Sequence, residues 1–325
     1  TTDTRIFSPL LYRLSYLARP YWKAGFHDKA LIKPKPPQAV KHIRTPRWMQ
    51  PSISRTISPI EPKSLERDPM RENHTALITA GASGLGLVIA ETLSKLGITI
   101  HIMDQDEAAL SKAQSRLPNA SFSLGDAASQ SDVEKIFRDL AVSGVRLDYL
   151  INNVGIAGPA GLIDDIDPTE WDRTIAVNLS SAFYVTRLAL PLLRATRGVI
   201  INISSTAGLF GCPHRSPYVA SKWALIGLTK TWAMEYGPDG IRVNAVCPGS
   251  IEGPRIDSVI ERDAANRGLN PAQVRADYEH QTSMRTLVTA DDVAQTVAFL
   301  CSDGARHISG QALAVDGHTE TLASL

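Results

Sequence analysis

The feature that most constrains the fold of this chain is a regular alternation, from Thr75 to Val315, of short β-branched runs with amphipathic stretches of helical length. Several runs are apolar throughout, which indicates strands buried on both faces and therefore a parallel sheet covered by helices. We expect strands at residues 75–79, 98–103, 121–124, 147–151, 199–203, 241–246 and 312–315. The pattern predicts an α/β fold with a doubly wound parallel sheet.

The stretches between these runs carry the apolar spacing of helices. In the first of them, one helical face is formed by Leu85, Ile89, Leu93 and Leu96. Similar faces predict further helices at residues 133–140, 168–195, 218–236 and 290–300.

No internal repeat and no Pro/Gly linker divides residues 70–325, which we interpret as one domain. Its one irregular part is the connection at 253–289, which is too long for an ordinary loop between a strand and a helix. We expect a substrate lid over about residues 250–289, with a short helix near Ile256 and Ile260 that folds one face onto the domain.

Residues 1–69 differ in composition from the rest of the 325-residue chain. They hold 13 Lys and Arg against 5 Asp and Glu, and 10 of the 20 prolines. Such a composition resists regular structure, so we expect a largely disordered extension. Its origin stays open between an Arg-rich organelle transit segment, a tail that docks elsewhere, and coding sequence upstream of a start at Met70, which we favour. The basic residues do not interleave regularly with aromatics, so no nucleic-acid partner is expected.

The three cysteines are Cys212, Cys247 and Cys301, far apart and in neither CxxC nor zinc-site spacing. They predict neither a disulfide framework nor a metal site, which fits a reducing compartment. Charges, Gly and Pro interrupt every apolar stretch before the roughly 18 residues that a membrane-spanning helix needs. We therefore expect a soluble, cytoplasmic protein without a membrane partner.

A glycine-rich turn, TAGASGLG over residues 79–86, follows the first expected strand and precedes the first expected helix. In this position backbone N–H groups and a helix N-terminus can bind a pyrophosphate. The next strand ends at Asp104, 18 residues beyond Gly86, where a carboxylate can accept both ribose hydroxyls of an adenosine. Both features also have a purely structural explanation. The glycines of the turn could serve only tight packing, and Asp104 could serve only as the cap of the next helix.

The turn and Asp104 together favour a dinucleotide cofactor. A carboxylate at Asp104 would repel a 2′-phosphate, and its neighbours Gln105 and Asp106 offer no cation to offset it. The sequence therefore favours NAD over NADP.

Two polar clusters stand where strands should end, at the carboxyl edge of the sheet. Ser204 and Ser205 close the strand at 199–203. Tyr218 and Lys222 begin a helix four residues apart, which places the phenol and the ammonium on one helical face. A nearby Lys lowers the pKa of a phenol from its ordinary value of about 10, so the pair can exchange a proton with an alcohol. The same spacing is also common in surface or packing pairs.

The order and spacing of these motifs resemble those of the short-chain dehydrogenase/reductase family over roughly residues 73–321. The motifs are the turn at 79–86, Gly125-Asp126, Asn152-Asn153-Val154-Gly155, Asn178, Ser205, Tyr218, Lys222, Pro248-Gly249, Gly310-Gln311 and Val315-Asp316-Gly317. The resemblance implies a Rossmann fold and an oxidoreductase that transfers a hydride between a secondary alcohol or ketone and a nicotinamide cofactor.

The resemblance also implies catalytic roles. Tyr218 would be the general acid/base, and Ser205 would hydrogen-bond the reacting oxygen. Lys222 would lower the pKa of Tyr218 and bind the nicotinamide ribose, and Asn178 would hold a water that links Lys222 to bulk solvent.

On the cofactor side, the resemblance implies that Asp126 meets the adenine edge and that Asn152 with Gly155 lines the cleft. The implied cofactor contacts are Gly81, Ser83, Gly84, Leu85, Gly86, Asp104, Asp126, Ala127, Asn153, Gly155, Tyr218, Lys222, Pro248, Gly249 and Ile251.

Three positions depart from the family pattern. Ala80 replaces the first Gly of the turn, for which we expect a modest backbone adjustment. Val154 replaces an Ala and narrows the cleft. Gly253 stands where the family has a Thr that contacts the nicotinamide carboxamide, so either Ser250 or a backbone group takes that role or the lid closes differently.

The substrate pocket is expected between residues 206–217, the loop after Val154, and the lid. His214 and Arg215 could reach a polar or anionic substrate, although a loop residue of either type is more often solvated. The lid holds one aromatic residue, Tyr278, and five arginines, which argues for a hydroxylated or carboxylated small molecule over a steroid. A solvated outer face would explain the lid charges equally well.

The sequence thus predicts an NAD-dependent oxidoreductase for a secondary alcohol or ketone on a polar small molecule. The alternatives are an NADPH-dependent 3-oxoacyl-carrier-protein reductase and a catalytically silent dinucleotide sensor. The resemblance also implies a homotetramer or homodimer, formed through the helices at 168–195 and 218–236 and the C-terminal strand.

Overall fold

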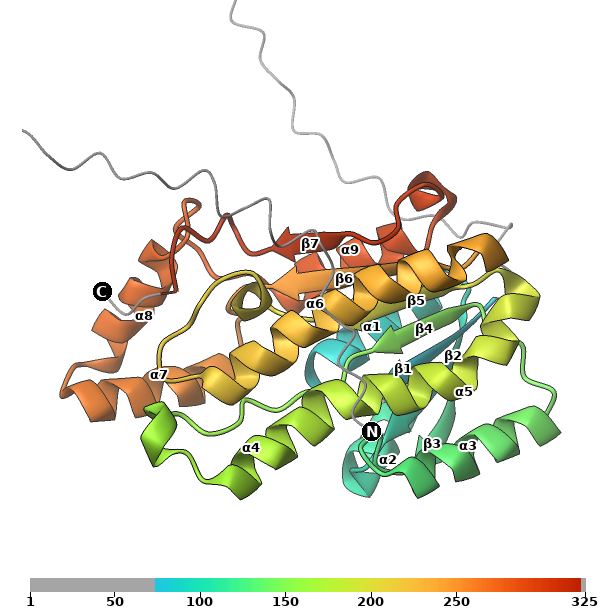
Figure 1. Ribbon diagram of the computed structural model, residues 1–325, viewed down its shortest axis with the longest axis horizontal. Coiled ribbons are helices and arrows are strands. Elements are labelled where there is room, and N and C mark those ends of the chain that lie inside the picture. The colour runs from blue at the N-terminus through green and yellow to red at the C-terminus, as the bar shows by residue number, and fades with distance from the viewer. Residues whose placement is uncertain (1–73, 323–325) are drawn as a thin grey trace, which may run out of the picture. The chain divides into compact units, whose positions relative to one another are not determined.

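Seven strands form one sheet in the order β3-β2-β1-β4-β5-β6-β7, with every neighbouring pair parallel (Figure 1). The computed structural model describes residues 74–322, and the extension expected over residues 1–69 lies outside them. The strands are β1 (Thr75–Thr79), β2 (Thr99–Asp104), β3 (Ser121–Leu124), β4 (Tyr149–Asn152), β5 (Val199–Ile203), β6 (Arg242–Pro248) and β7 (Ala312–Val315). The predicted strands and the doubly wound Rossmann fold are confirmed, with strand ends shifted by one or two residues.

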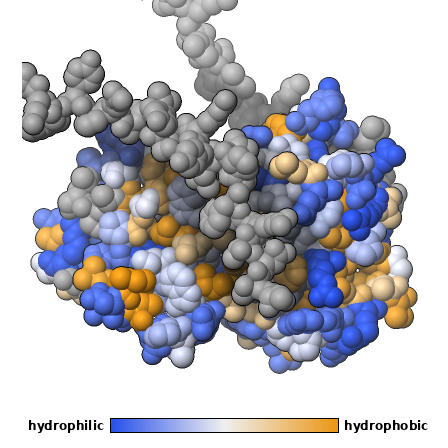
Figure 2. All heavy atoms as spheres, viewed as in Figure 1, coloured by the Kyte–Doolittle hydropathy of each residue, from blue (hydrophilic) through white to orange (hydrophobic). Residues whose placement is uncertain are grey.

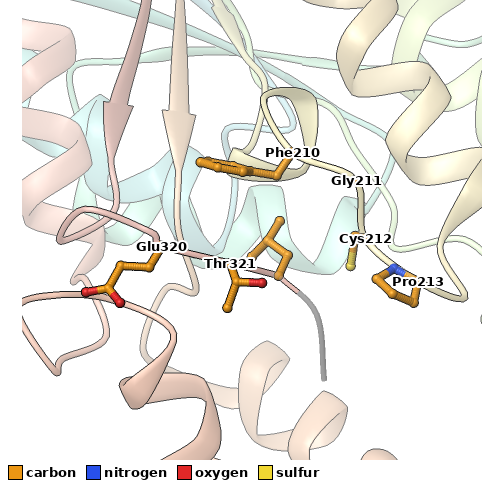
Figure 3. A pocket seen from close by; sticks show the side chains of 7 residues that line it. Phe210, Gly211, Cys212, Pro213, Glu320 and Thr321 are labelled. Carbon is orange, nitrogen blue, oxygen red and sulfur yellow. The ribbon is translucent and has the colours of Figure 1, made fainter. Parts of the chain in front are cut away.

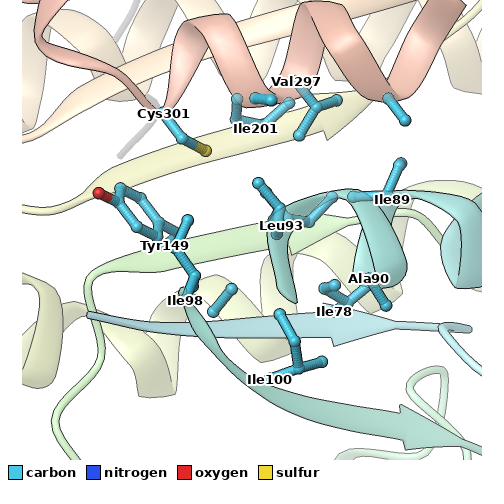
Figure 4. Close-up of a cluster of buried hydrophobic side chains, with 14 of the residues drawn as sticks. Ile78, Ile89, Ala90, Leu93, Ile98, Ile100, Tyr149, Ile201, Val297 and Cys301 are labelled. Atoms are coloured by element: carbon cyan, nitrogen blue, oxygen red, sulfur yellow. The ribbon is translucent and has the colours of Figure 1, made fainter. Parts of the chain in front are cut away.

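Helices cover both faces of the sheet. One face bears α1 (Gly84–Lys95), α2 (Glu107–Arg116) and α9 (Ala290–Leu300), and the other bears α3 (Gln130–Val142), α5 (Ser181–Thr196) and α6 (Ser216–Tyr236). Successive strand residues point to opposite faces, so Ile78 joins the first core and Leu77 the second, both fully buried. Figure 4 shows the first core, where side chains of α1 and α9 meet those of the strands.

The helix predicted over residues 168–195 is interrupted. A wider π-helical turn, Ala176–Ser180, joins α4 (Pro168–Ile175) to α5. Such π turns are frequent at functional sites, and this one carries the buried Asn178.

The continuous stretch Pro168–Thr196 is long and apolar enough to cross a membrane, with a mean hydropathy of 1.3. Its apolar side chains are used inside the domain, however. Val185, Ala189 and Leu193 are fully buried in the second core, where α5 packs against α3 and the sheet. This stretch is therefore a core helix of the Rossmann fold.

The sequence pattern does not predict α2, which buries only Leu110 and Ala113. It also underestimates the lid, which holds two helices, α7 (Pro254–Arg267) and α8 (Pro271–His280), where one short helix was expected. The lid has its own apolar cluster, formed by Ile256, Ile260, Ala264, Val274 and Leu287. Single 3₁₀ turns lie at Ile163–Asp165, Thr206–Gly208, Gly237–Asp239 and Asp303–Ala305.

His101 of β2 is a polar side chain inside this fold, only 6% exposed. Its Nδ1 lies 2.6 Å from Ser121 Oγ and its Nε2 lies 2.9 Å from Ser123 Oγ, both on the neighbouring strand β3. Burial lowers the pKa of His101 from 6.5 to about 4, because a buried imidazolium loses its hydration.

Acid is therefore expected to destabilise the fold through His101. The unfolded chain takes up this proton near pH 6.5, whereas the folded chain resists it until about pH 4. Stability that is present above pH 6.5 is thus lost as the pH falls through this window, by about 3 kcal/mol in full. Urea unfolding at about pH 7.5 and about pH 4.5 measures the loss. We expect a smaller loss in His101→Gln, and equal losses in both proteins would contradict the assignment.

Candidate active site

The glycine-rich turn joins β1 to α1 at the carboxyl end of β1, beside β4. The strand order reverses between β1 and β4, and ligands of doubly wound sheets bind at such a crevice. Asn153 fixes the turn, because its Nδ2 donates to the carbonyl oxygens of Thr79 at 3.2 Å and Ala80 at 3.0 Å. Ala80 has φ +49°, a left-handed conformation that costs a residue with a Cβ about 1 kcal/mol. This is the backbone adjustment expected for the missing glycine.

The turn has the shape of an anion cradle. A Cβ on Gly86 would lie 2.3 Å from Ala80 O, so only a glycine lets the turn approach the helix this closely. Gly84 has φ +51° and open space around it. Ser83 is exposed at the N-cap of α1 and its side chain makes no capping hydrogen bond. The first amides of α1 therefore keep their donors for a ligand, as a bound pyrophosphate requires.

Asp104, at the end of β2, faces this turn. Its Oδ2 accepts a hydrogen bond from the Ala82 amide at 3.1 Å, and its Oδ1 accepts one from the Asp106 amide at 3.1 Å. The N-cap of α2 is Asp106, whose side chain accepts from the Ala109 amide. Asp104 is thus not the helix cap, and the capping alternative is wrong.

The other predicted cofactor residues lie along the same carboxyl edge of the parallel sheet, after the ends of β3, β4 and β6. Asp126 is half-buried and accepts from the Ala128 amide at 2.8 Å, and Ala127 beside it is buried. Leu85, at the start of α1, is partly buried against the first core. The remaining members at this edge, besides the turn itself, are Asn153, Gly155, Pro248, Gly249 and Ile251.

Asn152 does not line the cleft as expected. It is 4% exposed, and its Nδ2 donates to Thr186 Oγ1 at 3.0 Å and to Asn202 Oδ1 at 2.8 Å. Its side chain therefore ties β4 to β5 and α5 inside the domain, while Asn153 takes the position beside the turn.

Ser205, Tyr218 and Lys222 come together after β5. Ser205 is near enough to Tyr218 to lower the pKa of its phenol. Lys222 Nζ lies 5.7 Å from the centroid of the Tyr218 ring and donates to Ile203 O at 3.0 Å. Lys222 is 3% exposed, so its ammonium acts on Tyr218 with little screening by water.

The charges around Tyr218 prepare it for proton transfer. Burial raises the pKa of the phenol, but Lys222, Ser205, Arg255 and Arg215 together bring it below its ordinary value. Burial also lowers the pKa of Lys222, against the opposing effect of Tyr218.

Asn178 borders the same site from the π-helical turn. Its Oδ1 accepts from the Ile156 amide at 2.8 Å, and its Nδ2 donates to Ile156 O and Ser221 Oγ, each at 3.1 Å. A Cβ on Gly155 would lie 3.2 Å from Lys222 Nζ and 3.6 Å from Asn178 Oδ1. The Gly155 backbone thus lies against both polar groups, and a side chain there would crowd Lys222.

At the start of the lid, the backbone has a conformation that disfavours Thr. Gly253 has φ +130°, a conformation that residues with a Cβ rarely adopt. The backbone therefore enters α7 differently from a chain with Thr at this position.

An open pocket of about 470 Å³ lies beside the predicted substrate loop (Figure 3). Residues 210–213 form one wall, within the expected 206–217 segment, and residues 320–322 near the C-terminus form the other. The C-terminal wall was not predicted, because no local motif marks it. Cys212 lines the pocket, and burial raises the pKa of its thiol.

A Tyr with a depressed pKa, at the same carboxyl edge of the sheet as a turn shaped for a pyrophosphate, is the arrangement of a nicotinamide-dependent oxidoreductase. A family model described as Enoyl-(Acyl carrier protein) reductase matches residues 79–318. The chain belongs to the short-chain dehydrogenase/reductase family.

Named relatives agree on the type of reaction. D-beta-hydroxybutyrate dehydrogenase of Cupriavidus necator is 35% identical over 255 residues, which are 76% of this chain and 98% of the relative. The crystal structure of NAD⁺-bound xylitol dehydrogenase has a TM-score of 0.72 at 26% identity and covers 75% of this chain and 98% of its own. Actinorhodin polyketide ketoreductase with NADPH also has a TM-score of 0.72, at 30% identity, with 76% and 97% covered. The chain is an NAD(P)-dependent enzyme that acts on CH–OH groups.

Proposed function

We propose that this enzyme uses NAD and interconverts a secondary alcohol of a polar small molecule with its ketone. The observation that carries the cofactor preference is the Asp104 carboxylate, which bonds the Ala82 amide of the glycine-rich turn. A 2′-phosphate at this place would meet a negative charge, whereas ribose hydroxyls would find an acceptor.

The residues of the site divide the chemistry between them. When bound, the cofactor supplies the acceptor for the hydride that leaves the carbinol carbon. Tyr218 takes the hydroxyl proton at its phenolate oxygen, and Ser205 holds the reacting oxygen. Lys222 stabilises the phenolate and contributes to binding the nicotinamide ribose. In the reduction direction Tyr218 returns the proton.

Asn178 and Gly155 support the proton path in this proposal. Asn178 is held by three hydrogen bonds, and the Gly155 backbone lies against both Asn178 and Lys222. A water there would pass the proton from the site toward solvent without opening the site.

Two other functions would give different results in the same assays. A 3-oxoacyl-carrier-protein reductase would prefer NADPH, the cofactor in the similar ketoreductase structure. A silent dinucleotide sensor would bind cofactor without turnover. The joint presence of Ser205, Tyr218 and Lys222, with the tyrosine pKa depressed, favours an active enzyme.

Asp104→Asn is expected to weaken the preference for NAD over NADP by about 10-fold to 100-fold in kcat/KM, since each tenfold is about 1.4 kcal/mol of binding. Asp106→Asn is the matched control, because it removes a nearby charge and keeps a side chain that caps α2. Steady-state kinetics with both cofactors measures the ratio. A wild-type preference for NADP, or an equal shift in both variants, would contradict the role of Asp104.

We also propose a cytoplasmic homo-oligomer, a homotetramer or a homodimer, formed through α5, α6 and the C-terminal strand. Phe183 of α5 and Trp223 of α6 support this, being 46% and 50% exposed. On the face that Figure 2 shows, the visible hydrophobic residues form separate groups among hydrophilic ones. The molar mass in solution tests the assembly.

A further inference from the structure

Arg215 lies directly over the proposed catalytic base. It is the N-cap residue of α6, three positions before Tyr218, and its guanidinium carbon is 5.5 Å from the centroid of the Tyr218 ring. Arg215 is half-buried, and no ion pair or hydrogen bond of its side chain occurs within residues 74–322. A cation thus lies over the Tyr218 ring without a counter-charge from this part of the chain.

Arg255 adds a second cation from the lid, near enough for its charge to reach the site. It is the second residue of α7, and it acts electrostatically on both Tyr218 and Lys222. Within residues 74–322, the charged groups that act on Tyr218 are Lys222, Arg255 and Arg215, all of them cations. The Tyr218 phenol therefore lies in a region of surplus positive charge.

The other four lid arginines are engaged elsewhere. Arg267 pairs with Asp263 and Asp277, Arg275 with Asp257, and Arg285 with Glu320. Arg262 donates to Ser258 O.

Arg255 differs from these four, because in the described part of the chain its side chain has neither an ion pair nor a hydrogen bond. Arg255 is exposed, so water reaches its guanidinium, but its charge also acts on Tyr218 and Lys222.

We propose that Arg215 and Arg255 together bind a carboxylate of the substrate, so that the substrate class is short hydroxy acids and the corresponding keto acids. This inference rests on the proposed function, since it needs a carbinol at Tyr218. The chain between the carbinol carbon and the carboxylate is only a few carbon atoms long, because Arg215 lies over the Tyr218 ring itself. A guanidinium fork matches the two oxygens of a carboxylate.

The carboxylate takes no part in the redox step. The carbinol C–H bond breaks as the hydride passes to the nicotinamide dinucleotide, the O–H proton goes to Tyr218, and the C–O bond becomes a carbonyl. The two arginines fix the carbinol beside Tyr218, and they favour an anion over a neutral molecule of the same shape.

The test compares each acid with its neutral ester. The probes are 2-hydroxybutyrate, 3-hydroxybutyrate and 4-hydroxypentanoate, which place the carboxylate at increasing separation from a secondary alcohol, and their methyl esters. We expect the best acid to exceed its ester in kcat/KM by at least about tenfold. Arg215→Gln and Arg255→Gln should each abolish most of this ratio, whereas the lid control Arg262→Gln should leave it unchanged. Because both probes use Tyr218, the ratio cancels any change in its pKa.

Two further measurements separate the possible failures. The affinity for NADH, from fluorescence titration, should be unchanged in all three variants, and a loss in Arg255→Gln would assign that residue to the cofactor and overturn the inference. Calorimetry of malonate and dimethyl malonate on the enzyme with NAD⁺ reports anion binding without turnover. If malonate binds and the Arg variants lose this binding, but no hydroxy acid or ester is oxidised, the proposed function is rejected and the anion site is retained. Equal use of acids and esters would retain the function and reject the anion site.

Discussion

Replacing Tyr218 with Phe is expected to lower kcat for alcohol oxidation by at least about 1,000-fold, because general acid/base catalysis typically contributes this order of rate enhancement. The substitution removes only the phenol oxygen, the group whose pKa Lys222 and Ser205 lower. The half-buried ring keeps its place, so the affinity for NADH should change by less than about twofold. Stopped-flow or steady-state absorbance of NADH measures the rate, and fluorescence titration measures the binding.

The matched control is Tyr236→Phe. Tyr236 lies at the opposite end of α6 from Tyr218, and its ring contacts Arg194 of α5. We expect it to retain the wild-type rate. In the wild type, kcat/KM for oxidation should rise with pH through an apparent pKa below the ordinary value of tyrosine, since the phenolate is the base and its pKa is lowered. A Tyr218→Phe enzyme that keeps a tenth or more of the wild-type rate would remove Tyr218 from the mechanism.

The fold could be predicted from the sequence wherever burial leaves a recognisable pattern of apolar residues. The β4 residues Leu150 and Ile151 are fully buried because helices cover both faces, and an uninterrupted apolar run is the direct result. The helix α2 leaves no such signal, since it touches the core through only Leu110 and Ala113. Its start is instead marked by the cap at Asp106, a signal that could have been used.

The site could be predicted where it follows strand ends, and less well where its geometry depends on single residues. We expected β4 to end at residue 151, but Asn152 is its last residue. The Asn152 side chain points into the domain and bonds Asn202, whereas the Asn153 side chain bonds the glycine-rich turn. The π turn at Asn178 widens the helix by packing that no local motif encodes. The pocket wall at 320–322 comes from a segment distant in sequence from the substrate loop, and only the folded sheet brings it near.

Replacing Gly86 with Ala is expected to weaken NADH binding by at least about 100-fold, the second large effect that this site should show. The added Cβ would lie 2.3 Å from Ala80 O, 2.6 Å from Asn153 Nδ2 and 2.9 Å from Gly81 Cα. Two of these atoms are backbone, so the turn itself must move, and overpacking of this kind costs about 1 to 3 kcal/mol of stability. The displaced amides would no longer converge on a pyrophosphate.

Gly227→Ala is the control for Gly86→Ala, because Gly227 is exposed on α6 and no atom outside its own helix and chain neighbours lies within 4 Å of a Cβ built there. We expect wild-type binding for it and a melting temperature at or slightly above that of the wild type, since Ala favours a helix over Gly by about 1 kcal/mol. Fluorescence titration with NADH and thermal unfolding, measured on both variants, separate loss of the cradle from loss of the fold. If Gly86→Ala bound NADH within about threefold of the wild type, the pyrophosphate would have to lie away from the turn, and the assignment of residues 79–86 to the cofactor would be wrong.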